Sequence, residues 1–437
     1  MKYFVFLLLY LTIPGTKLIA QEDSDENQFV EWIVRNAHEI KTVNPDEDFD
    51  DLRHLKVVLK DVKVVGLGES THGTSEFFKM KHRLLRFLVK EMNYTRFYLE
   101  ASMSRCRYIN DYVLYSKGNA DSATLIQGFV PWRVEEVRDM IEWIRTYNKS
   151  AAENKKVSFH GIDLQINDLA WKQLREFYKI VKEKKVTELD NLQQKADSAA
   201  KQSNNLNSQS KGAILFGAIH KEIMGIVDDI VMNQGEYEYK VGKENYQRNL
   251  MNIKLIAQET ESYKNLMVNF RDYYMAQNIL HLQNQGGDDT KGVVWAHNGH
   301  ISKGWTTMGS FLAEILGKKY YAIGFDFFSG SFQSRNKDIN NTSHNWDIIS
   351  LGAPPEKSLP WYLNKAGHEN FFIDFRFTGI ENLKAFSKSY PMHSFGSMYS
   401  ASWPQVYPEK LTNYDGLIFI RNSTAAKDFS REGMKPF

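Results

Sequence analysis

The chain has very little cysteine: one residue, Cys106, in 437. A single thiol forms no disulfide within the chain and cannot supply the paired cysteines of a structural zinc site. The sequence also lacks HExxH, the helical zinc motif of metalloproteases. Stability must therefore come from a hydrophobic core, for which 42% hydrophobic residues and 13% aromatic residues supply ample material.

An excess of charge of one sign is also missing. The chain has 55 basic and 53 acidic residues, and residues 1–20 hold two of the lysines and no acid, so the remainder is balanced at 53 of each. A neutral chain gives no electrostatic reason to expect nucleic acid or an anionic membrane as a partner. The length allows two or three domains, or one large α/β domain with an insertion, and no repeat of fixed period is present.

The longest apolar run lies at the N-terminus. Residues 1–20 (MKYFVFLLLYLTIPGTKLIA) begin with Lys2, continue as an apolar run and end in a small residue before Gln21. This pattern predicts a secretory signal peptide, a mature chain of residues 21–437 that starts with a flexible acidic stretch, and a periplasmic or secreted location. An uncleaved anchor is the alternative, although the run is too short for a permanent membrane span.

Short β-rich runs alternate with helical patterns, which favours βαβ units. The expected strands are Val62–Leu67, Arg96–Leu99, Val157–Ile162, Gly292–Ala296 and Tyr320–Phe325, with later strands at Phe371–Phe375 and Leu417–Arg421. The sequence therefore predicts an α/β fold with a largely parallel central sheet flanked by helices.

Two helices and a helical insertion are expected between these strands. A buried stripe at spacings of three and four predicts the first helix, and Glu135–Tyr147 shows a similar pattern. The stripe consists of Phe77, Met80, Leu84, Leu88 and Met92. About residues 167–285 are polar, contain no proline and have almost no β signal, which predicts long helices that form a cap or subdomain.

Acids and histidines follow several of the predicted strands. They are Glu69 and His72 after the first strand, Glu100 after the second, Asp163 after the third, and His297 and His300 after the fourth. Ligands of open α/β sheets bind in the crevice outside the carboxyl ends of the strands. If the strands are parallel neighbours, these side chains converge on one crevice, whereas each residue alone is as easily explained by a structural role.

The stretch GLGESTHGTSEF, residues 66–77, contains two candidate reactive side chains. A nucleophile elbow requires GxSxG, but His72 stands where the second glycine should be, so Ser70 is interpreted as a turn or cap hydroxyl. His72 lies in a glycine-rich turn, and imidazole titrates near neutral pH, so it is the candidate general base. Glu69 or Glu100 would fix its tautomer. The alternative is a histidine hydrogen-bonded within a buried turn.

His297 and His300 are three residues apart, and with the neighbouring acids they would also suit zinc or iron. A metal site is therefore the alternative reading of this cluster. Arg271 shares a helix face with Met275 and Asn278, where its charge could stabilise an oxyanion. The alternative for Arg271 is a surface pair with an acid such as Asp272.

Five segments in this order resemble the erythromycin esterase family: GESTHGTSEF, FYLEAS, GIDLQ, RDYYMAQN and WAHNGHIS. The resemblance covers roughly residues 50–330 and implies an α/β fold with a helical insertion and metal-independent hydrolysis of macrolide lactones. One departure is Lys81, where the family tends to carry arginine. Lysine cannot make the two parallel hydrogen bonds that arginine makes to a carboxylate.

The resemblance implies a role for each of these residues. His72 corresponds to the general base, Glu69 to an acid of the same loop, and Glu100, Arg271, His297 and His300 to residues of the cleft. We expect Asp163, Asn298 and Lys81 to contact substrate, and we expect neither a metal nor another cofactor.

The expected activity is hydrolysis of an ester or macrolide lactone by an exported enzyme, with water as co-substrate and without nucleic acid or a permanent membrane span. The alternatives are an exported metal- or haem-binding protein on a related scaffold, and an esterase of the cell envelope that acts on a non-antibiotic ester.

Overall fold

The structure is a computed structural model that describes residues 15–203, 209–264, 269–339, 346–376 and 379–428. Most of the expected signal peptide, residues 1–14, lies outside the described residues. Helix α1, Gly15–Asn36, includes the acidic stretch after residue 20, which is therefore helical; its expected flexibility stays a prediction. This helix is held to the body by Phe29, whose ring packs against Tyr362 and Tyr390 at 5.4 and 5.0 Å. None of the described helices is long and apolar enough to cross a membrane.

The strands form one large sheet and one small sheet. The large sheet has the order β1-β8-β12-β6-β2-β5-β3-β4, with β7 and β10 also paired to β6, and β9 pairs with β11. Their bounds are β1 His38–Glu39, β2 Val64–Leu67, β3 Arg96–Ser102, β4 Ser158–Asp163, β5 Gly292–Trp295, β6 Tyr320–Asn336, β7 Trp346–Leu351, β8 Asn370–Asp374, β9 Ser389–His393, β10 Met398–Tyr399, β11 Val406–Lys410 and β12 Gly416–Ser423.

The centre of the large sheet is parallel. Strands β12, β6, β2, β5, β3 and β4 are neighbours in this order and all pairs among them are parallel. Strands β2 and β5 are buried along their whole length because helices cover both faces of the sheet, which explains their continuous apolar sequences. The predicted fold class, a largely parallel sheet flanked by helices, is confirmed.

Strand β6 is longer than the sequence predicts. The expected strand ends at Phe325, whereas β6 continues to Asn336. Its second half pairs with β7 in antiparallel register, and Phe332 is buried there. Polar residues alternate with buried ones in this half of β6. The sequence here therefore lacks the apolar run that indicates a central strand, although the strand continues to pair with its neighbour.

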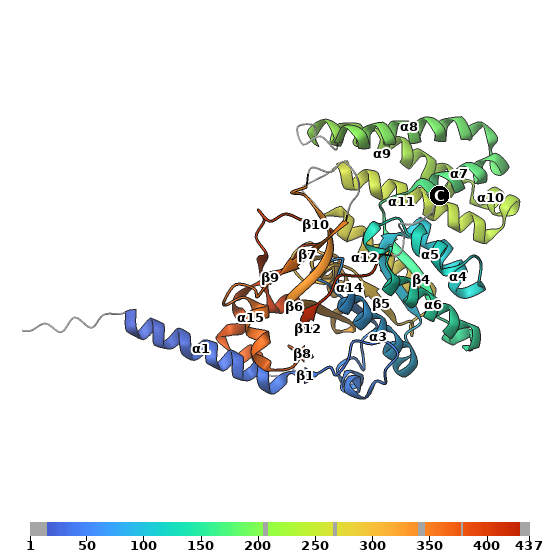
Figure 1. Ribbon diagram of the computed structural model, residues 1–437. Helices are drawn as coiled ribbons and strands as arrows, with labels where there is room; N and C mark the ends of the chain where they lie inside the picture. Colours follow the sequence, from blue (N-terminus) through green and yellow to red (C-terminus); the bar gives the residue numbers. More distant parts are fainter. Residues whose placement is uncertain (1–14, 204–208, 265–268, 340–345, 377–378, 429–437) are drawn as a thin grey trace, which may run out of the picture.

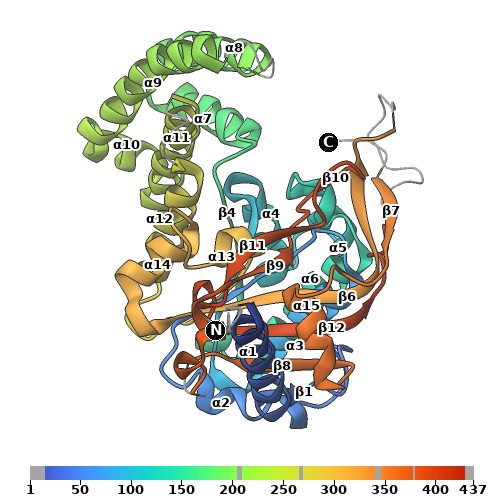
Figure 2. The same ribbon diagram turned by 90° about the vertical axis from the view of Figure 1, so that its left-hand side faces the viewer.

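The helices fall into two groups (Figures 1 and 2). The first lies with the sheet: α2 Leu55–Val58, α3 Ser75–Met92, α4 Met103–Tyr115, α5 Ala120–Ile126, α6 Glu135–Ser150, α13 Asn298–Ile301, α14 Met308–Leu316 and α15 Leu359–Leu363. The second lies between β4 and β5 in the sequence: α7 Asp168–Val181, α8 Val186–Ser203, α9 Gln209–Met232, α10 Gln234–Val241, α11 Lys243–Lys264 and α12 Phe270–Gln285. The predicted helices over the Phe77 stripe and at Glu135–Tyr147 correspond to α3 and α6.

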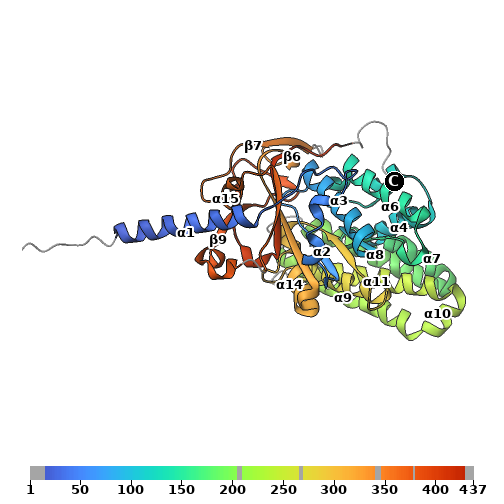
Figure 3. The ribbon, with the colours of Figure 1, turned by 90° about the horizontal axis from the view of Figure 1, so that it is seen from below.

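Helices α7 to α11 form a lobe with a core of its own. Trp171, Phe177, Ile223 and Tyr246 are buried in this core, which is separate from the two cores beside the sheet. Helix α12 returns from the lobe to the sheet, where Met275 and Ile279 join the core that contains Val294 of β5. Seen from below, α1 points away from the body on the side opposite this lobe (Figure 3).

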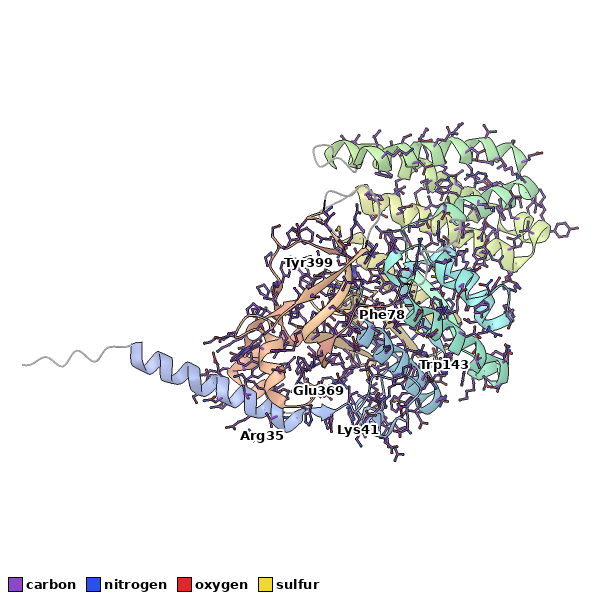
Figure 4. The ribbon with its side chains drawn as sticks, viewed as in Figure 1. Arg35, Lys41, Phe78, Trp143, Glu369 and Tyr399 are labelled. Atoms are coloured by element: carbon purple, nitrogen blue, oxygen red, sulfur yellow. The ribbon has the colours of Figure 1, made fainter. Side chains whose placement is uncertain are left out.

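An aromatic cluster lies beneath the carboxyl ends of the central strands. Phe78, labelled at the centre of the molecule in Figure 4, packs against Trp132 and Trp295 with ring centroids 5.7 and 5.0 Å apart. The two tryptophan rings meet edge to face at 5.7 Å. The cluster gives the loops above it a rigid apolar base.

Candidate active site

The loop after β2 presents an acid that is completely buried. Glu69 accepts hydrogen bonds from three neighbours: Lys81 Nζ at 2.5 Å, Trp295 Nε1 at 2.8 Å, and His72 Nδ1 at 2.5 Å. Burial lowers the pKa of Lys81 to about 8, against the opposing attraction of Glu69. Lys81 donates one hydrogen bond to Glu69, and its Nζ also lies over the ring of Trp295, 4.7 Å from the ring centroid.

The carboxylate of Glu69 orients the ring of His72. Because Nδ1 of His72 is bonded to Glu69, Nε2 is the nitrogen left for chemistry. The side chain is 11% exposed and lines a cavity. Its ring meets Trp132 edge to face at 5.2 Å, and its backbone N–H donates to the Gly396 carbonyl at 3.1 Å. His72 is thus fixed in position from the sheet side and open toward the cavity.

Ser70 has no group that would activate it. Its Oγ is buried and has no hydrogen-bond partner among the described residues, while its carbonyl accepts from the Phe395 N–H at 2.8 Å. A nucleophilic serine requires a base within hydrogen-bonding reach. The geometry agrees with the interpretation of Ser70 as a structural residue of the turn.

Arg271 of α12 is bound to the acids that follow β3 and β4. Its Nη2 donates to Glu100 Oε1 at 2.8 Å and to Asp163 Oδ2 at 2.5 Å. Burial opposes the charge of Glu100, but His300 and Arg271 nevertheless hold its pKa well below the usual range. Burial likewise opposes the charge of Arg271, whose pKa is nonetheless raised by Asp163 and Glu100. Glu100 and Arg271 are therefore both charged at neutral pH.

His300 lies between two carboxylates. Its Nδ1 lies 2.8 Å from Asp272 Oδ1, and its Nε2 lies 3.2 Å from Glu100 Oε1 and 3.0 Å from Arg271 Nη1. Burial would lower the pKa of His300, but the charges of Glu100 and Asp272 raise it to about 10. His300 is therefore an imidazolium at neutral pH.

Asp272 is a member of the site that the sequence did not reveal. The sequence suggested it only as a surface partner for Arg271, but it is 2% exposed and also accepts from the Met308 N–H at 2.7 Å. On a helix, adjacent residues face different directions, so Arg271 and Asp272 contact different neighbours. Its position next to Arg271 gave no indication that His300 would be its partner.

We expect Asp272→Asn to lower the pKa of His300, because one of the two carboxylates that raise it is removed. The folded pKa of about 10 exceeds the ordinary 6.5, so the stability that this histidine contributes is complete below about pH 6.5 and is lost as pH rises through about 10. In the variant this loss moves to lower pH. NMR titration of labelled histidine and unfolding midpoints from pH 6 to 10 measure both effects.

The matched control for this prediction is Asp228→Asn, which removes an exposed acid of α9. It should leave the titration of His300 and the pH profile of stability unchanged. An unchanged His300 titration in Asp272→Asn would contradict the assigned charge state.

His297 has the opposite charge state. Burial lowers its pKa to about 3, and the charges of His72 and His300 contribute further. Its Nδ1 accepts from the Gly299 N–H at 3.1 Å, so the ring proton is on Nε2. This Nε2 is buried and makes no well-formed hydrogen bond. The Ser70 carbonyl nevertheless interacts with the His297 ring and favours protonation of that ring. The neutral ring is therefore a hydrogen-bond donor, 5.2 Å from His72 between ring centroids.

A cavity of about 560 Å³ lies above these groups. Five of the predicted catalytic residues line it: His72, Glu100, Arg271, His297 and His300. Its outer wall includes residues to which the sequence assigned no role, among them Arg335, Trp346, Phe395 and Trp403. They come from β6, β7 and the segment after β9, where no motif marks them as functional.

The three residues expected to contact substrate do not line this cavity. Asp163 and Lys81 lie behind it, bonded to Arg271 and Glu69. The amide of Asn298 is occupied by the backbone of Phe325, with Nδ2 donating at 2.8 Å and Oδ1 accepting at 3.0 Å. These side chains contact other residues of the site, as Glu69 contacts His72, and their expected contact with substrate stays a prediction.

The described residues contain no group of three or more His, Cys, Asp or Glu side chains arranged to hold a metal ion. The acids of the site are instead bound to cations and to N–H donors.

The comparisons with known proteins agree with this fold. The chain is similar to an erythromycin esterase type II of Escherichia coli, at 25% identity over 92% of this chain and 99% of the relative, and to a putative hydrolase of Bacillus subtilis, at 24% identity over 96% of each. A crystal structure of a Bacillus cereus protein superposes with a TM-score of 0.76 at 25% identity, covering 93% of this chain and 99% of that one.

A solved structure of an erythromycin esterase variant in an open conformation has a TM-score of 0.65 at 18% identity over 90% of this chain and 98% of that one, a likeness of fold alone. The family model for erythromycin esterase matches residues 89–423. This match covers β3 through β12 and begins after the loop of Glu69 and His72. The chain belongs to the erythromycin esterase family.

Proposed function

We propose that this hydrolase opens an ester or a macrocyclic lactone of the erythromycin type with a water molecule activated by His72. One observation carries the proposal: the Glu69–His72 pair faces a cavity in which the buried Nε2–H of His297 lacks a well-formed hydrogen bond. A positioned base beside an N–H donor suits acyl transfer to water, in which one group accepts a proton and the other stabilises the oxyanion.

In the proposed reaction, Nε2 of His72 takes a proton from water while the water oxygen attacks the carbonyl carbon. The electrons of the carbonyl π bond move to oxygen, and the resulting oxyanion accepts a hydrogen bond from His297 Nε2–H. The intermediate then collapses, the C–O bond to the alcohol breaks, and the proton on His72 passes to the leaving oxygen. The products are a carboxylic acid and an alcohol, joined in one chain when the substrate is a lactone.

Glu69 supports the imidazolium that His72 becomes during this reaction, as an acid next to a histidine base does in triads. Arg271 was expected to touch the oxyanion, but its Nε and Nη2 donors are directed to Asp163 and Glu100. We therefore assign it to holding Glu100 and His300 in place. The His300 imidazolium at the cavity wall then contributes positive charge near the developing oxyanion.

The cavity walls suit a bulky substrate with apolar parts. Trp132, Phe395, Trp346 and Trp403 supply aromatic surface around the histidines, and Arg335 adds a cation at the outer wall. Apolar walls with a few polar groups are typical of small-molecule sites. Macrolide lactones combine a large apolar ring with one ester bond and so match this combination.

The direct test is incubation of the purified protein with erythromycin, followed by mass spectrometry. We expect a mass gain of one water in the antibiotic, which is absent with the His72→Ala variant. If erythromycin stays intact while simple esters are hydrolysed in a His72-dependent manner, erythromycin is excluded as the substrate. An ester of the cell envelope is then the proposed substrate.

Export is a separate part of the proposal and rests on residues 1–20. We expect the protein to be recovered outside the cytoplasm with Gln21 as its first residue. N-terminal sequencing of protein from cell fractions measures this, and an intact Met1 in the cytoplasmic fraction would contradict it.

A further inference from the structure

A second cavity of about 290 Å³ lies between the helical lobe and the loop after β4. Helix α11 contributes Glu259 and Tyr263 to it, α9 contributes Phe216, and Asn167 and Trp171 come from the start of α7. Tyr263 also hydrogen-bonds to Gln165, a residue that lines the active-site cavity. The two cavities therefore lie back to back across the segment from Gln165 to Asn167.

Asn167 is the unusual polar group of this second cavity. The residue is 5% exposed. Its Nδ2 donates to the Leu164 carbonyl at 2.5 Å and to Glu259 Oε2 at 2.9 Å, which fixes the orientation of the amide. Its Oδ1 is buried and has no hydrogen-bond partner among the described residues. A buried acceptor without a donor costs free energy, so a donor brought by a ligand would be favoured at this point.

The charge of this cavity is negative. Three carboxylates line it, Glu259, Asp168 and Asp197, against one guanidinium, Arg105. Arg105 is already bound to Asp168 through two contacts of 2.8 Å, so no cation of the cavity lining pairs with Glu259 or with the exposed Asp197. Burial raises the pKa of Glu259 to about 7, as expected for a carboxylate without a cation beside it.

The remaining walls are aromatic. Phe216 is 2% exposed and stacks on Tyr263 with ring centroids 4.6 Å apart, and Trp171 is 5% exposed. Aromatic faces attract cations and also cover apolar groups. An acceptor, a carboxylate and aromatic walls together are complementary to an N–H donor that carries positive charge and an apolar body.

We propose that this second cavity binds a protonated alkylamine, whose N–H groups bond to Asn167 Oδ1 and Glu259. The amine is either a free ligand or an amino group carried by the substrate that occupies the neighbouring active site. In the second case the proposal rests on the proposed hydrolase function, and in the first case it is independent of it.

The test is calorimetric titration of the full chain with N-methylcyclohexylamine, whose protonated form has two N–H groups, and with methyl cyclohexyl ether as a neutral probe of similar shape. We expect the amine to bind and the ether not to bind. Glu259→Gln should weaken amine binding at least about tenfold, the scale of one hydrogen bond to a charged group. The control Glu244→Gln, on the same helix but bonded to Arg248 at the surface, should keep the wild-type affinity.

Three results would overturn the proposal: no amine binding by the wild-type chain, equal binding of the ether, or unchanged affinity in Glu259→Gln. The His72→Ala variant should retain amine binding, so a failure of the proposed esterase does not affect this measurement. The source of the amine follows from the kinetics of two esters that differ only in whether they carry an amino group. A higher KM in Glu259→Gln for an amine-bearing ester alone identifies a substrate group, and unchanged KM values identify a free ligand.

Discussion

Replacement of His72 with alanine will lower kcat by at least about a hundredfold, the usual contribution of a general base. The ring removed is the one whose Nδ1 is bonded to Glu69 and whose Nε2 remains available to the cavity. Hydrolysis of erythromycin, or of a chromogenic ester if the antibiotic is not turned over, measures the effect under saturating substrate. Circular dichroism establishes that the variant is folded.

The matched control is Ser70→Ala, two residues earlier in the same loop. Because the Ser70 Oγ is buried and has no hydrogen-bond partner, its removal leaves no other group unsatisfied. We expect kcat to stay within about twofold and stability to be unchanged or slightly higher. Loss of activity in Ser70→Ala with full activity in His72→Ala would reverse the assignment and make the loop a nucleophile elbow.

The fold was largely predictable because the central strands are buried on both faces. Their apolar runs are visible without any partner, and the residues after them reach one edge because β2, β5, β3 and β4 are parallel neighbours. The second half of β6 was missed for the opposite reason, since it is stabilised by pairing with β7. Pairing of this kind leaves no apolar run in the strand itself.

The candidate site could be predicted only in part, because its chemistry depends on pairs that are distant in sequence. His300 is charged through Glu100 and Asp272, and these contacts follow from the return of α12 to the sheet. His297 is neutral because it is buried and because its Nδ1 accepts from the Gly299 N–H. The sequence places both histidines at one strand end but contains no information on their opposite charge states.

The fate of Asn298, Asp163 and Lys81 illustrates the same limit. Asp163 and Asn298 lie within motifs of the site and Lys81 follows one, and a residue type that binds substrate is equally suited to hold a neighbour. In the structure the Asn298 amide is bonded to the Phe325 backbone, and Asp163 to Arg271 at 2.5 Å. Polar groups that are fully satisfied by the protein have little capacity left for a ligand.

The second large effect is expected for Arg271→Met. This change leaves the carboxylates of Glu100 and Asp163 buried without their common cation, and breaking a buried pair in this way costs about 3–5 kcal/mol. Urea unfolding measures the loss. The control Arg248→Met removes a surface pair with Glu244, whose side chain is 89% exposed, and should cost at most about 1 kcal/mol.

A triple variant separates lost charge balance from lost packing. Combining Arg271→Met with Glu100→Gln and Asp163→Asn removes the unpaired charges while keeping the side-chain shapes, so most of the stability should return. Activity should not return, because Glu100 also holds the His297 N–H at 2.9 Å and supports the charge of His300. A triple variant as unstable as Arg271→Met would mean that packing of the Arg271 side chain, and not its charge, stabilises this part of the fold.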